Sequence, residues 1–465
     1  MKRLLIYVGL WTVAGIAGAR ASLPPNIVFI LIDDLGWADG GCFGSKFYRT
    51  PNINKLAASG MRFTQAYAAC AVCSPTRAAI MTGKFPARLH ITDWIPGEPT
   101  PPNSRFRLPP WRKELPLEEI TLAEMLKSSA YATACFGKWH LGGPEYFPEH
   151  QGFDLNIAGS DTGSPASYFW PYGASNNSHR VPGLSEKGGA TGEYLTDRLT
   201  DEALTWIEHN KAKPFFLYLA HYAVHAPLMG KRELVEQYSE SQGANGQSNS
   251  VYAAMVQSVD ESVGRILAKL DQLGLSKRTI VVFTSDNGGA VHFGKPPATS
   301  NAPLRLGKGY AYEGGLRVPL IVKAPGVTRA GSVSDVPVAS YDFFPTLLEL
   351  ADGKPTIKAP AIDGRSFVSV LKGKSQPVHR EFFWHYPHYW NRNGEKPVTP
   401  YSVARLGDWK LVRFYETARE ELYNLHDDPV EQHDLAATEV GQRRQLSTRL
   451  DEWLKDVGAQ MPIPR

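Results

Sequence analysis

The most reactive arrangement in the sequence is the run Cys73-Ser-Pro-Thr-Arg77, which is followed by a short helical pattern that ends at Gly83. Pro75 suits the first helical position, because its missing N–H would have no partner there, and glycine suits the end of a helix. Cys73 is therefore predicted at a helix N-terminus, where free N–H groups and the positive end of the helix dipole meet. With Arg77 one turn further on, the place favours an anion and an activated nucleophile.

Two adjacent carboxylates, Asp33 and Asp34, follow the apolar and β-branched run 26–32. A nearly continuous apolar run of this length is typical of a strand that is buried on both faces of a sheet. Two carboxylates at the end of such a strand repel each other unless a cation lies between them, which indicates a hard divalent metal. A helix cap or a turn is the alternative explanation for these acids.

Polar residues follow three more predicted strands in the same way. The strands are expected at 131–136, 214–220 and 279–284, and the polar residues after them are Lys138, His140, His221, His225, Asp286 and Asn287. Helical patterns lie between the strands, at 194–209 and along the apolar face of Val256, Val259, Val263, Ile266, Leu267 and Leu270. This alternation predicts an α/β protein with a mostly parallel sheet, in which ligands bind beyond the carboxyl ends of the strands.

The side chains at this edge supply two kinds of group. Asp33, Asp34, Asp286 and Asn287 offer only oxygen ligands, which favours Ca²⁺ or Mg²⁺ over zinc. The cationic or proton-donating groups are Arg77, Lys138, His140, His225 and Lys308, the last in a glycine-rich loop, 307–315, expected to be flexible. An oxyanion needs both kinds of partner. The sequence has no Gly-x-Ser-x-Gly elbow, P-loop or dinucleotide fingerprint.

Taken together, these motifs resemble the type I sulfatases of the alkaline phosphatase superfamily. In that family the cysteine of Cys-x-Pro-Ser/Thr-Arg is oxidised after translation to formylglycine (3-oxoalanine), and Thr76 stands here where the commonest form has serine. The resemblance runs from Asn26 to about Ala436, through the stretches 33–36, 73–77, 137–142, 225–227, 285–288, 307–309, 312–315 and 422–425. It implies an alkaline-phosphatase-like fold, with a large, mostly parallel mixed sheet flanked by helices.

The resemblance also implies a set of roles. One divalent ion, with Ca²⁺ favoured and Mg²⁺ as the alternative, would be bound by Asp33, Asp34, Asp286, Asn287 and the modified Cys73. The hydrated aldehyde at position 73 would attack sulfur, and His225, with Lys308, would protonate the departing oxygen. His140 would then accept the proton of the second hydroxyl, so that sulfate leaves and the aldehyde re-forms. Lys138 and Lys308 would bind sulfate oxygens, and Arg77 would hold the hydrate.

The ends of the chain indicate a targeting segment and a second domain. Lys2 and Arg3, the apolar run 4–17 and a small-x-small site ending at Ala21 predict a signal peptide over 1–21, hence a secreted or periplasmic protein. A catalytic domain is expected over 22–373. Short strands and a helix at 441–457 predict a smaller C-terminal α+β domain with an antiparallel sheet over 374–465.

Charge and cysteine content limit the other functions. Without the signal peptide the formal net charge is +1, so nothing indicates a nucleic-acid partner, and no apolar run is long enough for stable membrane insertion. Cys42, Cys70, Cys73 and Cys135 allow disulfides in an oxidising compartment, and Cys70 and Cys73 form a CxxC pair. The Ser-Pro-Thr-Arg run after Cys73 argues against a redox role for that pair.

The expected substrate is a sulfated carbohydrate, and the expected maturation partner is a formylglycine-generating enzyme. The segment 160–165 and the aromatic runs 168–172 and 384–390 are candidates for a sugar subsite, although packing between domains explains the aromatic runs equally well. A phosphodiesterase or phosphonate monoester hydrolase with the same modified cysteine is the first alternative. A sugar-binding pseudoenzyme is the second, and it is disfavoured because no expected catalytic residue is missing.

Overall fold

A computed structural model of the chain describes residues 23–173, 179, 181–184, 188–353, 355–374, 380–390 and 397–465. Its centre is a nine-stranded sheet in the order β10-β2-β8-β7-β1-β6-β4-β5, with β9 paired to β2. The strands are β1 (Asn26–Ile32), β2 (Met61–Tyr67), β4 (Ala132–Gly137), β5 (Leu155–Ile157), β6 (Phe215–His221), β7 (Thr279–Ser285), β8 (Arg317–Lys323), β9 (Ser332–Ser334) and β10 (Val338–Ala339). The predicted signal peptide lies outside the described residues.

The sheet is mostly parallel, as the alternation of strands and helices predicts. β1 pairs in parallel with both β6 and β7, and β4 pairs in parallel with β5 and β6. Only β8 is antiparallel to its neighbours β2 and β7. All seven residues of β1 are buried, which explains why its sequence is continuously apolar rather than alternating.

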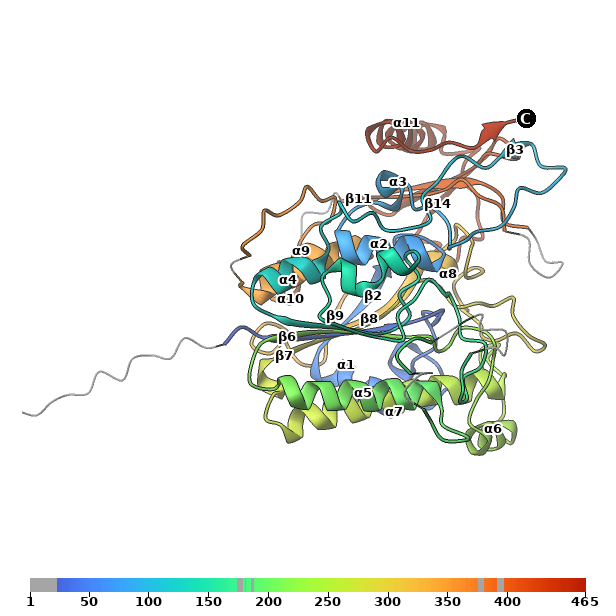
Figure 1. Cartoon of the computed structure of the whole chain (residues 1–465). Coiled ribbons are helices and arrows are strands. Elements are labelled where there is room, and N and C mark those ends of the chain that lie inside the picture. The colour runs from blue at the N-terminus through green and yellow to red at the C-terminus, as the bar shows by residue number, and fades with distance from the viewer. Residues whose placement is uncertain are drawn as a thin grey trace, which may run out of the picture.

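Helices cover both faces of this sheet (Figure 1). Ile27, Phe29 and Leu31 of β1 share one core cluster with α2 (Cys73–Thr82), α4 (Leu122–Ser128), α9 (Phe343–Ala351) and α10 (Val368–Leu371). Val28 and Ile30 belong to the cluster on the opposite face, with α1 (Pro51–Ser59), α5 (Leu195–Asn210) and α7 (Ser250–Gln272). The α/β class predicted from the sequence is confirmed.

Several elements differ from the sequence-based expectation. The prediction missed β2, whose polar residues interrupt the apolar alternation. The segment 84–119, which the predicted strands and helices leave out, contains the short elements α3 (Pro86–Leu89) and β3 (Phe106–Arg107). Two other helices are α6 (Arg232–Ser239) and α8 (Glu313–Leu316). Short 3-10 helices lie at Gly41–Phe43, Pro144–Tyr146, Pro148–Gln151, Ser276–Arg278 and Ser340–Asp342.

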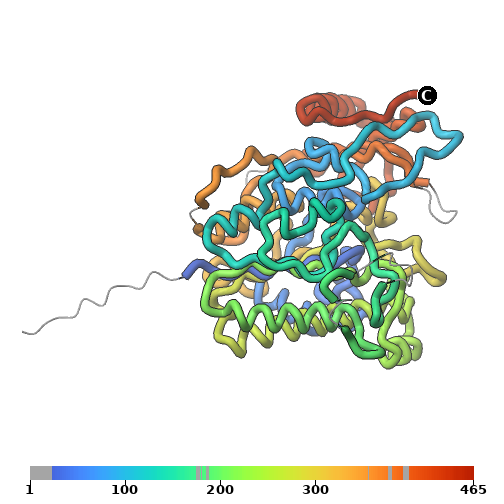
Figure 2. Tube along the Cα trace, viewed as in Figure 1, coloured from blue at the N-terminus to red at the C-terminus, as the bar shows by residue number. Residues whose placement is uncertain are grey.

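A second, antiparallel sheet stands beyond the α2 layer. Its strands are β11 (Glu381–Tyr386), β12 (Tyr401–Leu406), β13 (Trp409–Phe414) and β14 (Arg419–Asn424), and α11 (Val440–Asp456) packs on its outer face. The inner face contacts the α2 side of the first sheet through a shared core that includes Tyr67, Ala79, Trp384 and Val412. The C-terminal strand β15 (Ile463–Pro464) pairs with β3, so the chain end lies beside the segment near residue 106 (Figure 2).

No helix in the described ranges is both long enough and apolar enough to cross a membrane.

Buried histidines are expected to make the fold sensitive to acid. Burial lowers the pKa of His221 and His388 to about 3 and that of His385 to about 4, whereas each takes up its proton near pH 6.5 once unfolded. When the pH falls below the pKa of the unfolded state, only the unfolded chain takes up the proton, and the folded protein loses stability. Each of these histidines is therefore expected to lower the free energy of unfolding by about 2.5 kcal/mol by about pH 4.5. Urea titrations at several pH values measure this loss.

The matched variants for this measurement are His385→Gln and His426→Gln. His385 is buried, whereas the side chain of His426 is largely exposed. His385→Gln should flatten the curve of stability against pH, and His426→Gln should leave it unchanged. Superimposable curves for all three proteins would refute the assignment.

Candidate active site

The carboxyl ends of four parallel strands meet at one edge of the central sheet. Ile32 of β1 is level with His221 of β6 and with Ser285 of β7, and Gly137 of β4 is level with Ala220. Because parallel strands all end at the same edge, the residues that follow them are brought together. These are Asp33, Asp34, Lys138, His140, His225, Asp286 and Asn287.

Cys73 joins this edge from α2. The strand β2 ends at Tyr67 on the same side, and the helix begins at Cys73 itself rather than at Pro75 as expected. All ten residues of α2 are buried, and Gly83 ends the helix with φ +68°, a conformation that glycine adopts without strain.

The unmodified thiol of Cys73 is not an activated nucleophile. Burial raises its pKa, and the nearby lysines Lys138 and Lys308 do not reverse this effect. All four cysteines are free, so none of the disulfides that the sequence allowed is present among the described residues.

Lys308 reaches the same edge from the opposite direction. Because β8 runs antiparallel to β7 and begins at Arg317, the loop before it lies beside the carboxyl end of β7. The expectation that this loop is flexible is wrong. Lys308 is only 4% exposed, its N–H donates to the Gly289 carbonyl at 3.1 Å, and the Gly309 N–H donates to the Ala71 carbonyl at 2.8 Å.

Three carboxylates and three cations alternate at the base of the site. The Lys138 Nζ lies 2.7 Å from Asp33 Oδ2, and the Lys308 Nζ lies 2.7 Å from Asp34 Oδ1. Arg77 donates through Nε and Nη2 to Asp286 Oδ2, at 2.9 and 2.8 Å. Although burial opposes it, Lys308 holds the pKa of Asp34 below its usual range. For Asp33, in contrast, burial and the neighbouring Asp286 and Asp34 raise the pKa well above its usual range although Lys138 opposes this effect.

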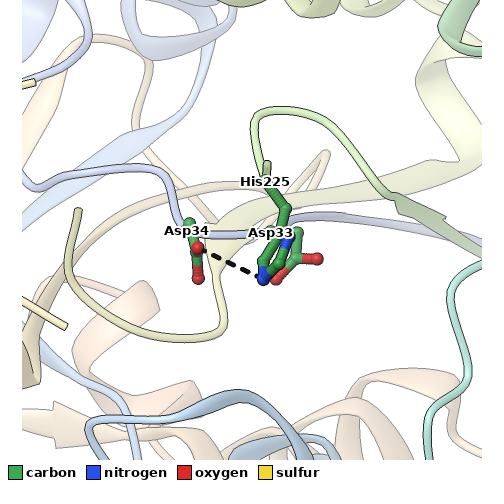
Figure 3. A group of neighbouring side chains, drawn as sticks. All are labelled: Asp33, Asp34 and His225. Atoms are coloured by element: carbon green, nitrogen blue, oxygen red, sulfur yellow. Dashed lines mark ion pairs between the residues drawn. The ribbon is translucent and has the colours of Figure 1, made fainter. Parts of the chain in front are cut away.

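The acids form two groups that could hold a metal ion. Donor atoms of Asp33, Cys73 and Asp286 lie within 4.8 Å of one another, and so do donor atoms of Asp33, Asp34 and His225. Figure 3 shows Asp34 and His225 facing each other, with 3.6 Å between Asp34 Oδ2 and His225 Nε2.

Two buried oxygen atoms in this cluster lack the hydrogen-bond donor that a buried oxygen normally has. Within the described part of the chain, neither Asp33 Oδ1 nor Asn287 Oδ1 accepts a hydrogen bond, although both are buried. Asn287 is fixed by its amide group, which donates to Asp34 Oδ1 at 2.8 Å. Unsatisfied carboxylate and amide oxygens are the donors that Ca²⁺ and Mg²⁺ prefer, so these residues fit a hard divalent cation.

The two histidines of the site each have one ring nitrogen fixed by a carbonyl. His140 Nε2 contacts the Ile95 carbonyl, which can only accept, so this nitrogen carries the proton and Nδ1 has the free lone pair. Burial and Lys138 lower the pKa of His140 well below its usual value, so the ring is neutral. His225 Nδ1 donates in the same way to the Ala226 carbonyl at 2.7 Å, which leaves Nε2 facing Asp34.

A cavity of about 520 Å³ opens above these groups. Its floor includes Cys73, His140, His225 and Lys308, and its walls consist of Trp94, Ile95, Pro96, Asp161, Thr162, Gly163, Ser164, His179, Phe293 and Trp390. The segment 160–165, which the sequence suggested as a candidate for a sugar subsite, contributes four of the lining residues. Of the two aromatic runs, only Trp390 lines the cavity, and it also packs in the core cluster that contains Trp384. Tyr168 and Tyr172 are buried in another core cluster.

Some lining residues carry no recognisable signal in the sequence. His179 and Phe293 stand outside every motif, and only the folded chain brings them to the cavity. His221, the last residue of β6, lies instead in the core, where its Nε2 meets the Ser262 hydroxyl at 3.0 Å.

Comparison with known proteins identifies relatives along the whole described chain. A family model described as "Sulfatase" matches residues 25–353, and one described as "N-sulphoglucosamine sulphohydrolase, C-terminal" matches residues 306–460. A protein of Formosa agariphila named "Sulfatase" is 34% identical and covers 93% of this chain and 89% of its own length. The N-acetylgalactosamine-6-sulfatase of Mus musculus is 37% identical, over 80% of this chain and 70% of the mouse protein.

Solved protein structures also match this chain over most of its length. The crystal structure of Ps i-CgsB superposes with a TM-score of 0.76 at 30% identity, and 93% of each chain is covered. The same protein in complex with k-i-k-neocarrahexaose gives a TM-score of 0.74 over the same share of each chain.

Proposed function

This chain belongs to the sulfatase family and hydrolyses sulfuric esters, and from this premise we propose that it releases sulfate from a sulfated carbohydrate through formylglycine at position 73. The observation that carries the proposal is the placement of Cys73 at the start of a buried helix, at the floor of a cavity and beside Asp33 and Asp286. In this reading the Cys73 Sγ stands in for the hydroxyl groups of the hydrated aldehyde.

The proposed cofactor is one divalent cation, with Ca²⁺ favoured and Mg²⁺ as the alternative. Asp33, Asp34, Asp286 and Asn287 would hold it together with modified residue 73, and the two unsatisfied oxygens described above support this set. When bound, such a cation supplies Lewis-acid stabilisation of the negative charge that develops on the oxygens.

The proposed reaction uses side chains that already surround the cavity floor. One hydroxyl of the hydrate attacks sulfur while the bond from sulfur to the sugar oxygen breaks. Lys308, which is a cation here, supplies a proton to that oxygen through His225 Nε2, and the proton of the attacking hydroxyl restores the lysine. Lys138 and Lys308 bind the sulfate oxygens, and Arg77 fixes the position of Asp286 and of the hydrate.

Release of sulfate requires the second hydroxyl of the hydrate. His140, whose Nδ1 has a free lone pair, accepts the proton of that hydroxyl. The electron pair of the O–H bond then forms the aldehyde C=O as the bond from carbon to the sulfate oxygen breaks. Water adds to the aldehyde and restores the hydrate for the next cycle.

A carbohydrate is the proposed substrate class because of the cavity walls and the names of the relatives. Trp94 and Trp390 present aromatic surface, and Asp161 and Ser164 present hydroxyl-binding groups. Aromatic rings with nearby polar groups suit a sugar ring, which has both apolar C–H faces and hydroxyls. A relative at 30% identity was solved in complex with k-i-k-neocarrahexaose, and another relative is named as an N-acetylgalactosamine-6-sulfatase.

The remaining proposals concern maturation and organisation. A formylglycine-generating enzyme would convert Cys73, and the segment 1–21 would direct the chain to the periplasm or the outside of the cell. We also propose a domain boundary at 373/374, which is supported by the separate sheet of β11–β14.

Peptide mass spectrometry across Cys73 tests the proposal, on protein made with a formylglycine-generating system and assayed for sulfate release. The expected result is conversion of the thiol to an aldehyde in protein that releases sulfate. An unmodified Cys73 in active protein would overturn the mechanism. An aldehyde that cleaves phosphate diesters or phosphonate monoesters but no sulfate ester would favour the first alternative function instead.

Trp94 provides a prediction about the sugar subsite. Trp94→Ala should raise KM for a sulfated oligosaccharide by about 3- to 10-fold, since an aromatic contact contributes about 0.5–1.5 kcal/mol beyond its area. KM for a small aryl sulfate should change little, and Trp94→Phe should retain most of the oligosaccharide affinity. Steady-state kinetics on both substrates measure this, and equal changes for the two would exclude a sugar-specific contact.

A further inference from the structure

We propose that the C-terminal sheet positions Lys308 through a buried ion-pair triad, in which Lys410 of β13 lies between Glu313 of α8 and Glu431 of the segment after β14. The inference rests on the role proposed above for Lys308 at the sulfate group. It assigns a positioning function to three residues outside the cavity, of which Lys410 lies on the second sheet.

The triad is completely buried and tightly connected. The Lys410 Nζ lies 2.9 Å from Glu313 Oε1 and 2.7 Å from Glu431 Oε1, and all three side chains are fully inaccessible. The backbone N–H of Glu313 donates to Glu431 Oε2 at 2.7 Å. The other oxygen of Glu313 accepts from Tyr67 and Arg317, at 2.7 and 2.8 Å. Glu313 is therefore held by both sheets at once.

The other end of the Lys308 loop is held by the same segment. Arg305 Nη1 donates to the Glu431 carbonyl at 2.8 Å and to the Tyr423 hydroxyl at 3.0 Å. Arg305 also lies over the ring of Tyr312, 3.8 Å from its centroid. Lys308 thus occupies a loop whose two flanks, Arg305 and Glu313, are both fixed by Glu431.

The loop has no free space in which to absorb a shift. The Gly288 N–H donates to the Gly315 carbonyl at 3.0 Å, directly after the metal-ligand candidate Asn287. A Cβ atom at Gly288 would lie 1.8 Å from the Gly314 carbonyl oxygen, and one at Gly314 would lie 2.2 Å from that of Leu306. A displacement of Glu313 is therefore transmitted along the backbone to Lys308, whose Nζ lies 2.7 Å from Asp34.

The buried triad contributes a fixed geometry to the fold. Apolar side chains of similar volume stabilise an interior about as well as a buried ion pair, because burial of charge carries a large desolvation cost. The two ion pairs and the hydrogen bond from the Glu313 N–H instead fix the direction of each contact as well as its distance. A catalytic group displaced by about 1 Å loses about 10²-fold in rate, which makes such precision useful beside Lys308.

The test is a double-mutant cycle between Glu431 and Lys308. Glu431→Ala should lower kcat by about 10- to 100-fold on an alkyl sulfate, whereas Glu431→Gln, which keeps an acceptor for the Glu313 N–H, should restore most of it. In a Lys308→Ala background, Glu431→Ala should have almost no further effect on kcat. If Glu431→Ala does not fold, Arg305→Met is placed in the same cycle.

Arg380→Met is the matched control. Arg380 forms a largely buried ion pair with Asp342, and among the described residues it makes no hydrogen bond or ion pair with the 305–315 loop. The Arg380→Met variant should lower the urea midpoint of unfolding, yet leave kcat unchanged in both the wild-type and the Lys308→Ala backgrounds. Full additivity of the Glu431 and Lys308 effects would overturn the positioning role. Full activity of Lys308→Ala alone would instead overturn the proposed role of Lys308.

Discussion

Cys73→Ala is expected to reduce sulfate release by about 10⁵-fold or more, because it removes the only group in the cavity proposed to attack sulfur. The helix should survive the change, since alanine is a good helix former and the side chain of Cys73 makes no disulfide. Release of inorganic sulfate from an aryl sulfate and from a sulfated oligosaccharide measures the loss. Circular dichroism confirms that the variant is folded.

Cys70→Ala is the matched control for this variant. Cys70 is also buried and free, three residues before Cys73, but it does not line the cavity. It should keep most of the activity, apart from a modest loss of stability. Equal losses in the two variants would mean that the segment is needed for folding rather than for attack on sulfur.

Cys73→Ser separates attack from release. A serine hydroxyl can accept the sulfate group, but it lacks the second hydroxyl from which His140 would take a proton. The variant should therefore carry out at most one turnover and retain one SO₃ unit on residue 73. Intact mass spectrometry after incubation with substrate detects this adduct, and steady turnover by the serine variant would refute the role given to the hydrate.

Asp33→Asn is expected to abolish binding of the divalent cation and to lower activity by about 10³-fold, since a metal at such a site contributes several kcal/mol to the transition state. Asp33 belongs to both candidate ligand groups, and its Oδ1 atom is one of the two unsatisfied oxygens. Calorimetric titration with Ca²⁺ and with Mg²⁺ measures the binding. The same titrations determine which of the two ions the site prefers.

Removal of the metal by a chelator should leave the wild-type protein folded. Each of the three carboxylates forms an ion pair with Arg77, Lys138 or Lys308, and these contacts remain when the metal is removed. Added Ca²⁺ should then raise the melting temperature, because ligands that bind only the native state stabilise it by mass action. No thermal shift with any divalent cation would contradict the proposed metal site.

Asp39→Asn is the control for the metal experiments. Asp39 is buried six residues after Asp33, but it binds Thr299, Tyr252 and the Gly36 N–H rather than the cluster. Its replacement should lower stability while Ca²⁺ affinity is retained. Loss of Ca²⁺ binding in both variants would show that general distortion, and not the missing ligand, explains the result.

The sequence predicted best where the chemistry is local. The apolar run 26–32 became β1 with the expected bounds, and Gly83 ended α2 as expected, because hydrophobic pattern and backbone preference act over a few residues. The strand β2 was missed because its pattern is broken by Arg62, Thr64 and Gln65.

What the sequence by itself determined is the set of reactive groups and the side of the sheet on which most of them lie. Each group follows a buried strand, and parallel strands have their carboxyl ends at one edge, so Asp33, Lys138, His225 and Asp286 had to be neighbours once the α/β pattern was recognised. Only the tertiary structure decided the position of Lys308, which depends on the antiparallel direction of β8 and on contacts with Glu431, more than 100 residues away. No local pattern encodes strand direction or contacts between distant segments, because both are set by the packing of the whole chain.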